Sequence, residues 1–363
     1  MLIILALLFY CFIVSLSFKQ NSKLAAFLIF AGCVFVMGYR SVDYTADNVA
    51  YAGFFINESK RTIAESWKLV LAQDTKDPFF YFIGNILSKL GFTYRGYFVL
   101  IAAVFMGGYS YLMQKYSKDY FMSVLFLFSL NYAYFSMTGL RQALAMGFCF
   151  FAFDMAIRKK PIPFIILVLI GYLFHSSALI FLVFYPLKNF RITYKQGIAV
   201  AIAGFLALAF PSVINSIVEF FAWNDDLMAY SDRTTGLTIS GFIIQLAILT
   251  FCGIYLAHDS NNSLRNISRI EPSPEFIAQK PMYEPYMNIM FLGLIIQAFA
   301  VNIDNIFRMS MYFAIFAGLA ITNAVEVQEG ENKTAFKVVL TLLLIVQFFR
   351  TTSYNSFTMF GGF

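Results

Sequence analysis

The apolar run at residues 162–187, IPFIILVLIGYLFHSSALIFLVFYPL, holds His175, Ser176 and Ser177 at its centre. Basic residues flank it on both sides, at positions 158–160 and at positions 188, 191 and 195. Basic loops stay on the cytoplasmic side of a membrane, so both flanks are predicted on the same side. The run is therefore predicted to enter the bilayer and return, as a broken or re-entrant helical hairpin with His175 at its turn.

The length of this run supports a hairpin. Half of its 26 residues form a helix of about 18–20 Å, which is shorter than a hydrocarbon core of roughly 30 Å. Broken helices at membrane depth are tolerated only where they face protein or water. We therefore expect His175 to lie in a cavity that opens to the outside.

The composition of the whole chain is that of a membrane protein. Hydrophobic residues make up 60% of the 363 residues and charged residues only 13%, where a soluble domain has roughly a quarter charged. Helices satisfy their own backbone groups in lipid, so the predicted fold is all-α, a single polytopic membrane domain over 1–363. Hydropathy predicts about 10–12 membrane helices including the hairpin. The single-pass candidates are Leu2–Ser17, Leu24–Tyr39, Gly96–Met113, Phe121–Met137, Gln142–Ile157, Gly197–Phe221, Ile239–Ala257, Asn288–Val301, Met309–Asn323 and Phe336–Phe349.

The basic residues orient these helices. With the N-terminus outside, most of them fall in inner loops, as the positive-inside rule requires: Lys19, Lys23, Lys115, Lys118, Arg158, Lys159, Lys160, Lys188, Arg191, Lys195, Arg265, Arg269, Lys280, Lys333 and Lys337. The short outer loops hold only Arg141, Arg233, Arg308 and Arg350. This distribution explains the net charge of +6 without a nucleic-acid partner.

Two loops stand out from the short connections. Residues 40–95 form a long polar segment on the predicted outer side, in which Ile63, Trp67 and Leu71 suggest an amphipathic helix on the membrane surface. Phe79–Leu90 is apolar but too short to span, so we expect it to be interfacial or re-entrant. The proline-rich loop at 258–287 is predicted to be cytoplasmic.

Arginine is the only basic residue type in the short outer loops. Its planar guanidinium matches phosphate oxygens in a bidentate fork, which suits a pyrophosphate at a membrane edge. Arg141 begins a predicted helix, whose free N-terminus adds anion affinity. Arg308 is also a candidate, although Asp304 stands four residues before it and could simply pair with it.

His175 and two acidic residues are the candidates for proton transfer. An ordinary histidine changes charge near neutral pH, and a sugar hydroxyl needs deprotonating help; alternatively, His175 only holds the hairpin turn. Asp43 and Asp47 are four residues apart, so they could act as acid or base, bind a metal, or simply be solvated. The four cysteines lie in apolar runs without a Cys/His cluster, so we predict no metal site and no cofactor.

Four stretches, in chain order, resemble motifs of the EpsG-like proteins, a branch of the Wzy-type oligosaccharide repeat-unit polymerases. They are Gly38-Tyr39-Arg40 with Asp47 and Tyr51, Asp77-Pro78-Phe79-Phe80, Gly139-Leu140-Arg141-Gln142-Ala143-Leu144-Ala145, and Phe174-His175-Ser176-Ser177-Ala178-Leu179. The resemblance covers residues 38–190. Thr45 stands where the family has glycine, and Asp77 where it has glutamate.

This resemblance implies a membrane glycosyltransferase that polymerises polyprenyl-pyrophosphate-linked oligosaccharides into an O-antigen, capsule or exopolysaccharide. The implied donor and acceptor are lipid-linked, the site faces outward from a bacterial cytoplasmic membrane, and a chain-length regulator and a flippase are possible partners. We take His175 and Asp47 as candidate catalytic residues and expect Arg40, Asp43, Tyr51, Asp77, Arg141, Gln142, Ser176 and Arg308 to bind substrate.

Three other functions compete with polymerisation. A transporter or flippase of lipid-linked oligosaccharides would also have broken helices, but the internal repeats typical of that class are not evident. An O-antigen ligase or a metal-dependent membrane glycosyltransferase could use the same lipid donor.

Overall fold

Helices make up the secondary structure of the computed structural model, which describes residues 2–18, 22–73, 76–190, 192–210, 236–256, 283–300, 304–326 and 330–352, together with residues 212, 216 and 328. The described chain divides into two compact units. The first comprises residues 1–182 and 339–363, and the second residues 183–338. The predicted loop at 258–287 lies largely outside the described residues.

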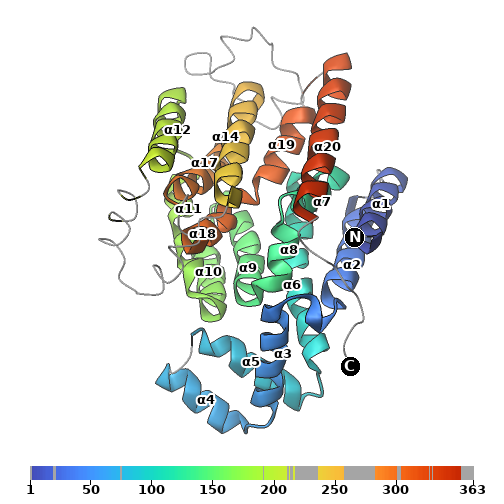
Figure 1. Cartoon of the computed structure of the whole chain (residues 1–363), viewed down its shortest axis with the longest axis vertical. Helices are drawn as coiled ribbons and strands as arrows, with labels where there is room; N and C mark the ends of the chain where they lie inside the picture. The colour runs from blue at the N-terminus through green and yellow to red at the C-terminus, as the bar shows by residue number, and fades with distance from the viewer. Residues whose placement is uncertain are drawn as a thin grey trace. The chain divides into compact units, whose positions relative to one another are not determined.

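The first unit contains the predicted hairpin as far as Leu182 and the long outer segment (Figure 1). Its helices are α1 (Leu2–Ser17), α2 (Ser22–Gly38), η1 (Val42–Tyr44), α3 (Ala46–Ser59), α4 (Ile63–Ala72), α5 (Pro78–Lys89), α6 (Tyr94–Tyr116), α7 (Tyr120–Ser129), α8 (Tyr132–Thr138), α9 (Leu140–Ile157), α10 (Pro161–Phe174) and η2 (Ser176–Val183), with the later part of α20 (Gly330–Thr352). The second unit holds α11 (Phe184–Leu187), α12 (Tyr194–Ala209), α14 (Gly236–Leu256), α17 (Tyr283–Phe299), α18 (Asp304–Ala314) and α19 (Ala317–Glu326).

Four described helices are long and apolar enough to cross a membrane: Tyr94–Tyr116, Leu140–Ile157, Ile306–Glu326 and Glu331–Thr351. A fifth span is possible if α7 and α8, which meet at a 60° bend, count as one. The bend falls at Asn131, whose φ is +64°, several residues before the break that Thr138-Gly139 predicts. The remaining apolar helices, among them α1, α2 and α10, have 10–17 residues. The all-helical membrane fold is confirmed, while a total of 10–12 membrane helices stays a prediction.

Small residues let the central helices of the first unit approach closely. A Cβ on Gly108 of α6 would lie 2.6 Å from the carbonyl oxygen of Gly147 on α9, and a Cβ on Gly147 would lie 2.8 Å from the carbonyl oxygen of Val104. A Cβ on Gly171 of α10 would lie 3.1 Å from the carbonyl oxygen of Ala145. Such contacts between small residues are how membrane helices associate without a hydrophobic drive between them.

The run at 162–187 breaks where the sequence predicts. Helix α10 ends at Phe174, and His175 takes an extended conformation (φ −159°, ψ 120°). The rings of Phe164 and Phe181 lie 6.2 Å apart, although a continuous helix would separate these positions by about 25 Å. The chain therefore folds back along α10 after His175.

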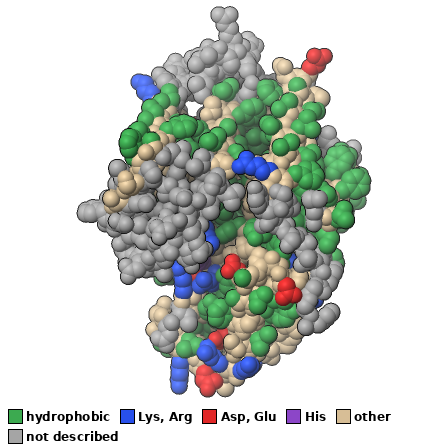
Figure 2. Space-filling model, viewed as in Figure 1, with side chains coloured by type: hydrophobic (Ala, Val, Ile, Leu, Met, Phe, Trp, Pro, Cys, Tyr) green, Lys and Arg blue, Asp and Glu red, His purple; other side chains and the backbone are tan. Residues whose placement is uncertain are grey.

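Helices α3, α4 and α5 form a tier across one end of α6, α8, α9 and α10 (Figure 1). Asn85 of α5 donates to the carbonyl oxygens of Glu58 (2.6 Å) and Arg61 (3.1 Å). The hydroxyl of Tyr97 on α6 donates to the carbonyl oxygen of Phe80 (2.7 Å). Figure 2 shows Lys, Arg, Asp and Glu side chains gathered over this tier. Trp67 and Leu71 of α4 stay exposed, as expected of an interfacial helix.

Candidate active site

Asp77 lies at the start of α5 in a left-handed conformation, with φ +56° and ψ +55°. The following residue, Pro78, disfavours the right-handed helical region for it, and aspartate tolerates the left-handed region better than most residues. Its carboxylate makes no hydrogen bond to its own helix. The side chain is therefore available for partners elsewhere in the chain, at the cost of some local backbone strain.

The carboxylate of Asp77 contacts the hairpin turn at two points. Its Oδ2 lies 2.7 Å from Nδ1 of His175, and its Oδ1 accepts the backbone N–H of Ser176 at 3.2 Å. The turn itself is fixed by the backbone: the N–H of His175 donates to Gly171 (3.0 Å) and that of Ala178 to His175 (3.0 Å). Two segments about a hundred residues apart thus meet at one carboxylate.

Arg141 is the third member of this cluster and comes from the first turn of α9. Its Nη1 lies 3.1 Å from Oδ2 of Asp77 and donates to the carbonyl oxygen of Lys76 at 3.0 Å. A side-chain hydrogen bond also joins Arg141 to Tyr51 of α3. A guanidinium has five N–H donors, so these contacts leave some for an incoming anion.

The charges in the cluster decide which nitrogen of His175 carries a proton. Burial alone would raise the pKa of Asp77, but the hydrogen bond and charge of His175, the charge of Arg141 and the N–H of Ser176 hold it below its ordinary value. The carboxylate is therefore ionised at neutral pH and can only accept hydrogen bonds. Nδ1 of His175 must donate to it, and in the neutral ring Nε2 is then the acceptor.

This arrangement can take up a proton next to a cation. The side chain of Asp77 is only 5% exposed, whereas those of His175 and Arg141 are 18% and 21% exposed. Among the described residues, none hydrogen-bonds to Nε2 of His175. A base oriented by a carboxylate, beside an arginine that can bind an anion, can deprotonate a hydroxyl and stabilise a leaving phosphate.

Arg40 lies in a different setting from the one we expected. It is 2% exposed, donates to the carbonyl oxygen of Met37 (2.5 Å) and to Oδ1 of Asn48 (3.0 Å), and stacks 4.6 Å over the ring of Phe98. Burial lowers the pKa of Arg40 to about 9, which leaves the side chain charged at neutral pH. This geometry favours positioning of α3 on α2 over direct contact with a substrate.

Asp43 and Asp47 are exposed on η1 and α3. Within the described part of the chain, neither forms a hydrogen bond or an ion pair with Asp77, His175 or Arg141. Asp47 lies close enough to Tyr134 of α8 to act on it electrostatically. Groups of three or more His, Cys, Asp or Glu side chains that could hold a metal ion are absent from the described residues.

The other predicted substrate-binding residues fall into three settings. Tyr51 joins the cluster through Arg141, and its ring packs 5.6 Å from that of Phe80. Ser176 is exposed and takes part through its backbone N–H, while Gln142 is 4% exposed. Arg308 is exposed on α18 in the second unit, and the side chain of Asp304, its predicted partner, lies outside the described residues.

The pairing of Asp77 with His175 was not predicted from the sequence, because Asp77 was expected to bind the substrate. Tyr81 was missed altogether, although it lies close enough to Arg141 to interact with it electrostatically. It stands four residues after Asp77, so the helical period of α5 could have indicated that it shares a face with that residue.

Comparison with known proteins gives one match. A sequence model of the EpsG family matches residues 23–361. No curated protein and no solved structure matches the chain.

Proposed function

The chain belongs to the EpsG family, which is implicated in exopolysaccharide biosynthesis, and we propose that it is a polymerase of lipid-linked oligosaccharide repeat units. The observation that carries this proposal is the contact of one ionised carboxylate, Asp77, with both His175 and Arg141. Such a cluster holds a base and an anion-binding group against the same carboxylate.

Each member has a distinct part in the proposed reaction. Nε2 of His175 takes the proton from a hydroxyl on the non-reducing sugar of the acceptor. That oxygen attacks the anomeric carbon of the growing chain, and the bond from this carbon to the polyprenyl pyrophosphate breaks. Arg141 stabilises the charge that the departing pyrophosphate gains. Asp77 orients the imidazole and stabilises its protonated form, as an aspartate does in a hydrolase triad.

The membrane setting fits this chemistry. The cluster lies where the tier of α3–α5 meets the start of α9 and the turn after α10, and all three segments belong to one unit. The positive-inside rule places this end of the helices outside, where the growing polymer would be made. Asp47, Asp43, Tyr51 and Arg308 remain candidates for sugar and lipid contacts.

A test of the proposal uses the purified full chain with a lipid-linked repeat unit as the only substrate. We expect a ladder of products that grows by one repeat unit at a time and survives EDTA. Movement of the substrate across a vesicle membrane without a ladder would indicate a flippase. A single transfer to a foreign acceptor would indicate a ligase, and loss of the ladder in EDTA a metal-dependent glycosyltransferase.

The proposed orientation has its own test. All four cysteines are free and buried, so they can be replaced to give a cysteine-free background. His175→Cys in that background should react with a membrane-impermeant thiol reagent added outside the cell. Reaction only from the cytoplasmic side would contradict the proposed topology.

A further inference from the structure

A groove of about 280 Å³ lies between α2 and α6, within the first unit. It is bordered by the first half of α2 and the last turns of α6, so it is near the opposite end of α6 from Tyr97, which holds the tier. Its volume is close to the lower end of the range for small-molecule sites, roughly 300 Å³. The proposed reaction involves none of the residues that line this groove, and the family membership assigns no role to it.

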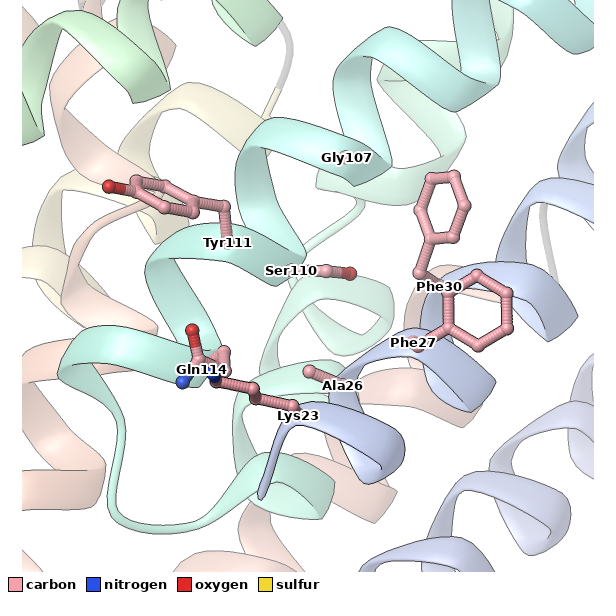
Figure 3. A pocket seen from close by; sticks show the side chains of 8 residues that line it. All are labelled: Lys23, Ala26, Phe27, Phe30, Gly107, Ser110, Tyr111 and Gln114. Atoms are coloured by element: carbon pink, nitrogen blue, oxygen red, sulfur yellow. The ribbon is translucent and has the colours of Figure 1, made fainter. Parts of the chain in front are cut away.

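The groove has one apolar wall and one polar end. Phe27 and Phe30 of α2 form the wall, and Phe27 is 61% exposed, so the groove is open at the side of the helix pair. Lys23 and Gln114 close the polar end (Figure 3). Tyr111 also borders it, but its hydroxyl points away from the groove and donates to Asp154 at 2.7 Å.

Ser110 gives an independent sign of a missing ligand. Its side chain is buried, with 5% of the residue exposed, and no residue that the structure describes hydrogen-bonds to its hydroxyl. A serine in a helix can bond back to a carbonyl one turn earlier, but this one instead points into the groove toward the rings of α2 (Figure 3). A buried hydroxyl without a partner is unfavourable, so a bound oxygen-rich group would stabilise it.

Charge limits the choice of ligand. Among the described residues that line the groove, Lys23 is the only charged one and none is a carboxylate. Among the described residues, Lys23 forms no ion pair. Basic pockets between membrane helices on the cytoplasmic side are typical sites for anionic headgroups.

We propose that this groove binds one anionic phospholipid, with its phosphate on Lys23, Ser110 and Gln114 and an acyl chain along Phe27 and Phe30. The lipid belongs to the leaflet at the end of the bundle remote from the Asp77 cluster. It fastens α2 to α6 and so supports the helix whose other end carries the tier.

The test measures the thermal stability and lipid retention of the purified full chain in detergent. The probes are phosphatidylglycerol, phosphatidylcholine and glycerol 3-phosphate. We expect phosphatidylglycerol alone to raise the melting temperature and to remain bound in native mass spectra. Equal protection by phosphatidylcholine, or by glycerol 3-phosphate without an acyl chain, would overturn the proposal.

Two variants locate the binding. A cation beside an anionic headgroup raises the affinity roughly fivefold. Lys23→Glu both removes this attraction and adds a repulsion of similar size, so it should weaken phosphatidylglycerol binding about 25-fold. Gly107→Leu should abolish it, because a Cβ there meets only the Phe30 ring at 3.7 Å and a longer side chain fills the groove without a backbone clash. Lys118→Glu is the matched control, since Lys118 is exposed just beyond the end of α6 and does not line the groove. Wild-type affinity in both Lys23→Glu and Gly107→Leu would overturn the site.

Discussion

Two aspartates of the first unit with buried side chains, Asp77 and Asp154, both pair with an arginine, but we assign them different roles. Asp154 is fully buried on α9, and its carboxylate contacts Lys115, Tyr111, Tyr116 and Arg158. All of these come from the facing turns of α6 or the end of α9 itself. Asp77 draws its partners from two separate segments, the start of α9 and the turn after α10, and among the described residues none hydrogen-bonds to Nε2 of His175. A carboxylate whose partners lie on two packed helices fastens those helices, whereas one that orients an imidazole with an unpaired acceptor nitrogen can serve a reaction.

The largest effect is expected at His175. His175→Ala should lower polymer formation by about a thousandfold, because it removes the proposed general base, a contribution of roughly 10²–10⁴. The measurement is the rate of ladder growth by the purified variant, with binding of the lipid-linked donor as the control. A variant that keeps a few per cent of activity, beside an inactive Asp47→Asn, would move the role of base to Asp47.

The second-largest loss of activity is expected for Arg141→Lys. Lysine keeps the charge but lacks the planar fork, so the loss should approach that of Arg141→Ala, about a hundredfold in rate. Arg158→Lys is the matched control at the other end of α9, where the arginine is 45% exposed and pairs with Asp154. Near-normal polymer from Arg141→Lys at equal expression would rule out bidentate binding of pyrophosphate by this residue.

At the other end of the unit the expected effect is on stability. Asp154→Asn removes the charge that faces Lys115 and Arg158. Breaking a buried ion pair costs about 3–5 kcal/mol, and the partial exposure of both cations reduces this to about 2 kcal/mol. Thermal unfolding in detergent measures the change. An unchanged melting temperature would show that this carboxylate does not fasten α6 to α9.

The dependence of rate on pH sharpens the assignment of the base. Asp77 has a pKa below its ordinary value, so it stays ionised and its titration does not limit the rate near neutral pH. A base works when deprotonated, so the rate of the wild-type protein should rise with pH, and this rise should be lost in His175→Ala. The same rise in His175→Ala would instead point to another base, such as Asp47.

Local features of the fold could be predicted from the sequence. The first helix has the predicted bounds Leu2–Ser17, the long apolar run breaks at His175, and α4 forms where Ile63 and Trp67 indicate it. Each of these depends on hydrophobic period, helix capping or charge within a short window. Here Thr62 and Glu65 form a capping box at the start of α4.

The site could be predicted only in part, because its geometry depends on contacts between distant segments. Arg141 and His175 were singled out from their own surroundings. Their meeting at Asp77 depends on how α5 packs against α10, where the rings of Phe79 and Phe174 lie 5.5 Å apart. Arg40 shows the same limit, since nothing in its local sequence distinguishes a buried guanidinium stacked over the ring of Phe98 from an exposed one.

The central claim is that the Asp77 cluster carries the reaction and the Asp154 cluster does not. The most direct test is the turnover of Asp77→Asn and Asp154→Asn, each measured per folded molecule on the same lipid-linked repeat unit. We expect at least a roughly tenfold loss for Asp77→Asn, because the imidazole loses its orienting charge, and a change within about twofold for Asp154→Asn. Full turnover by Asp77→Asn, or an equal loss in both variants, would contradict it.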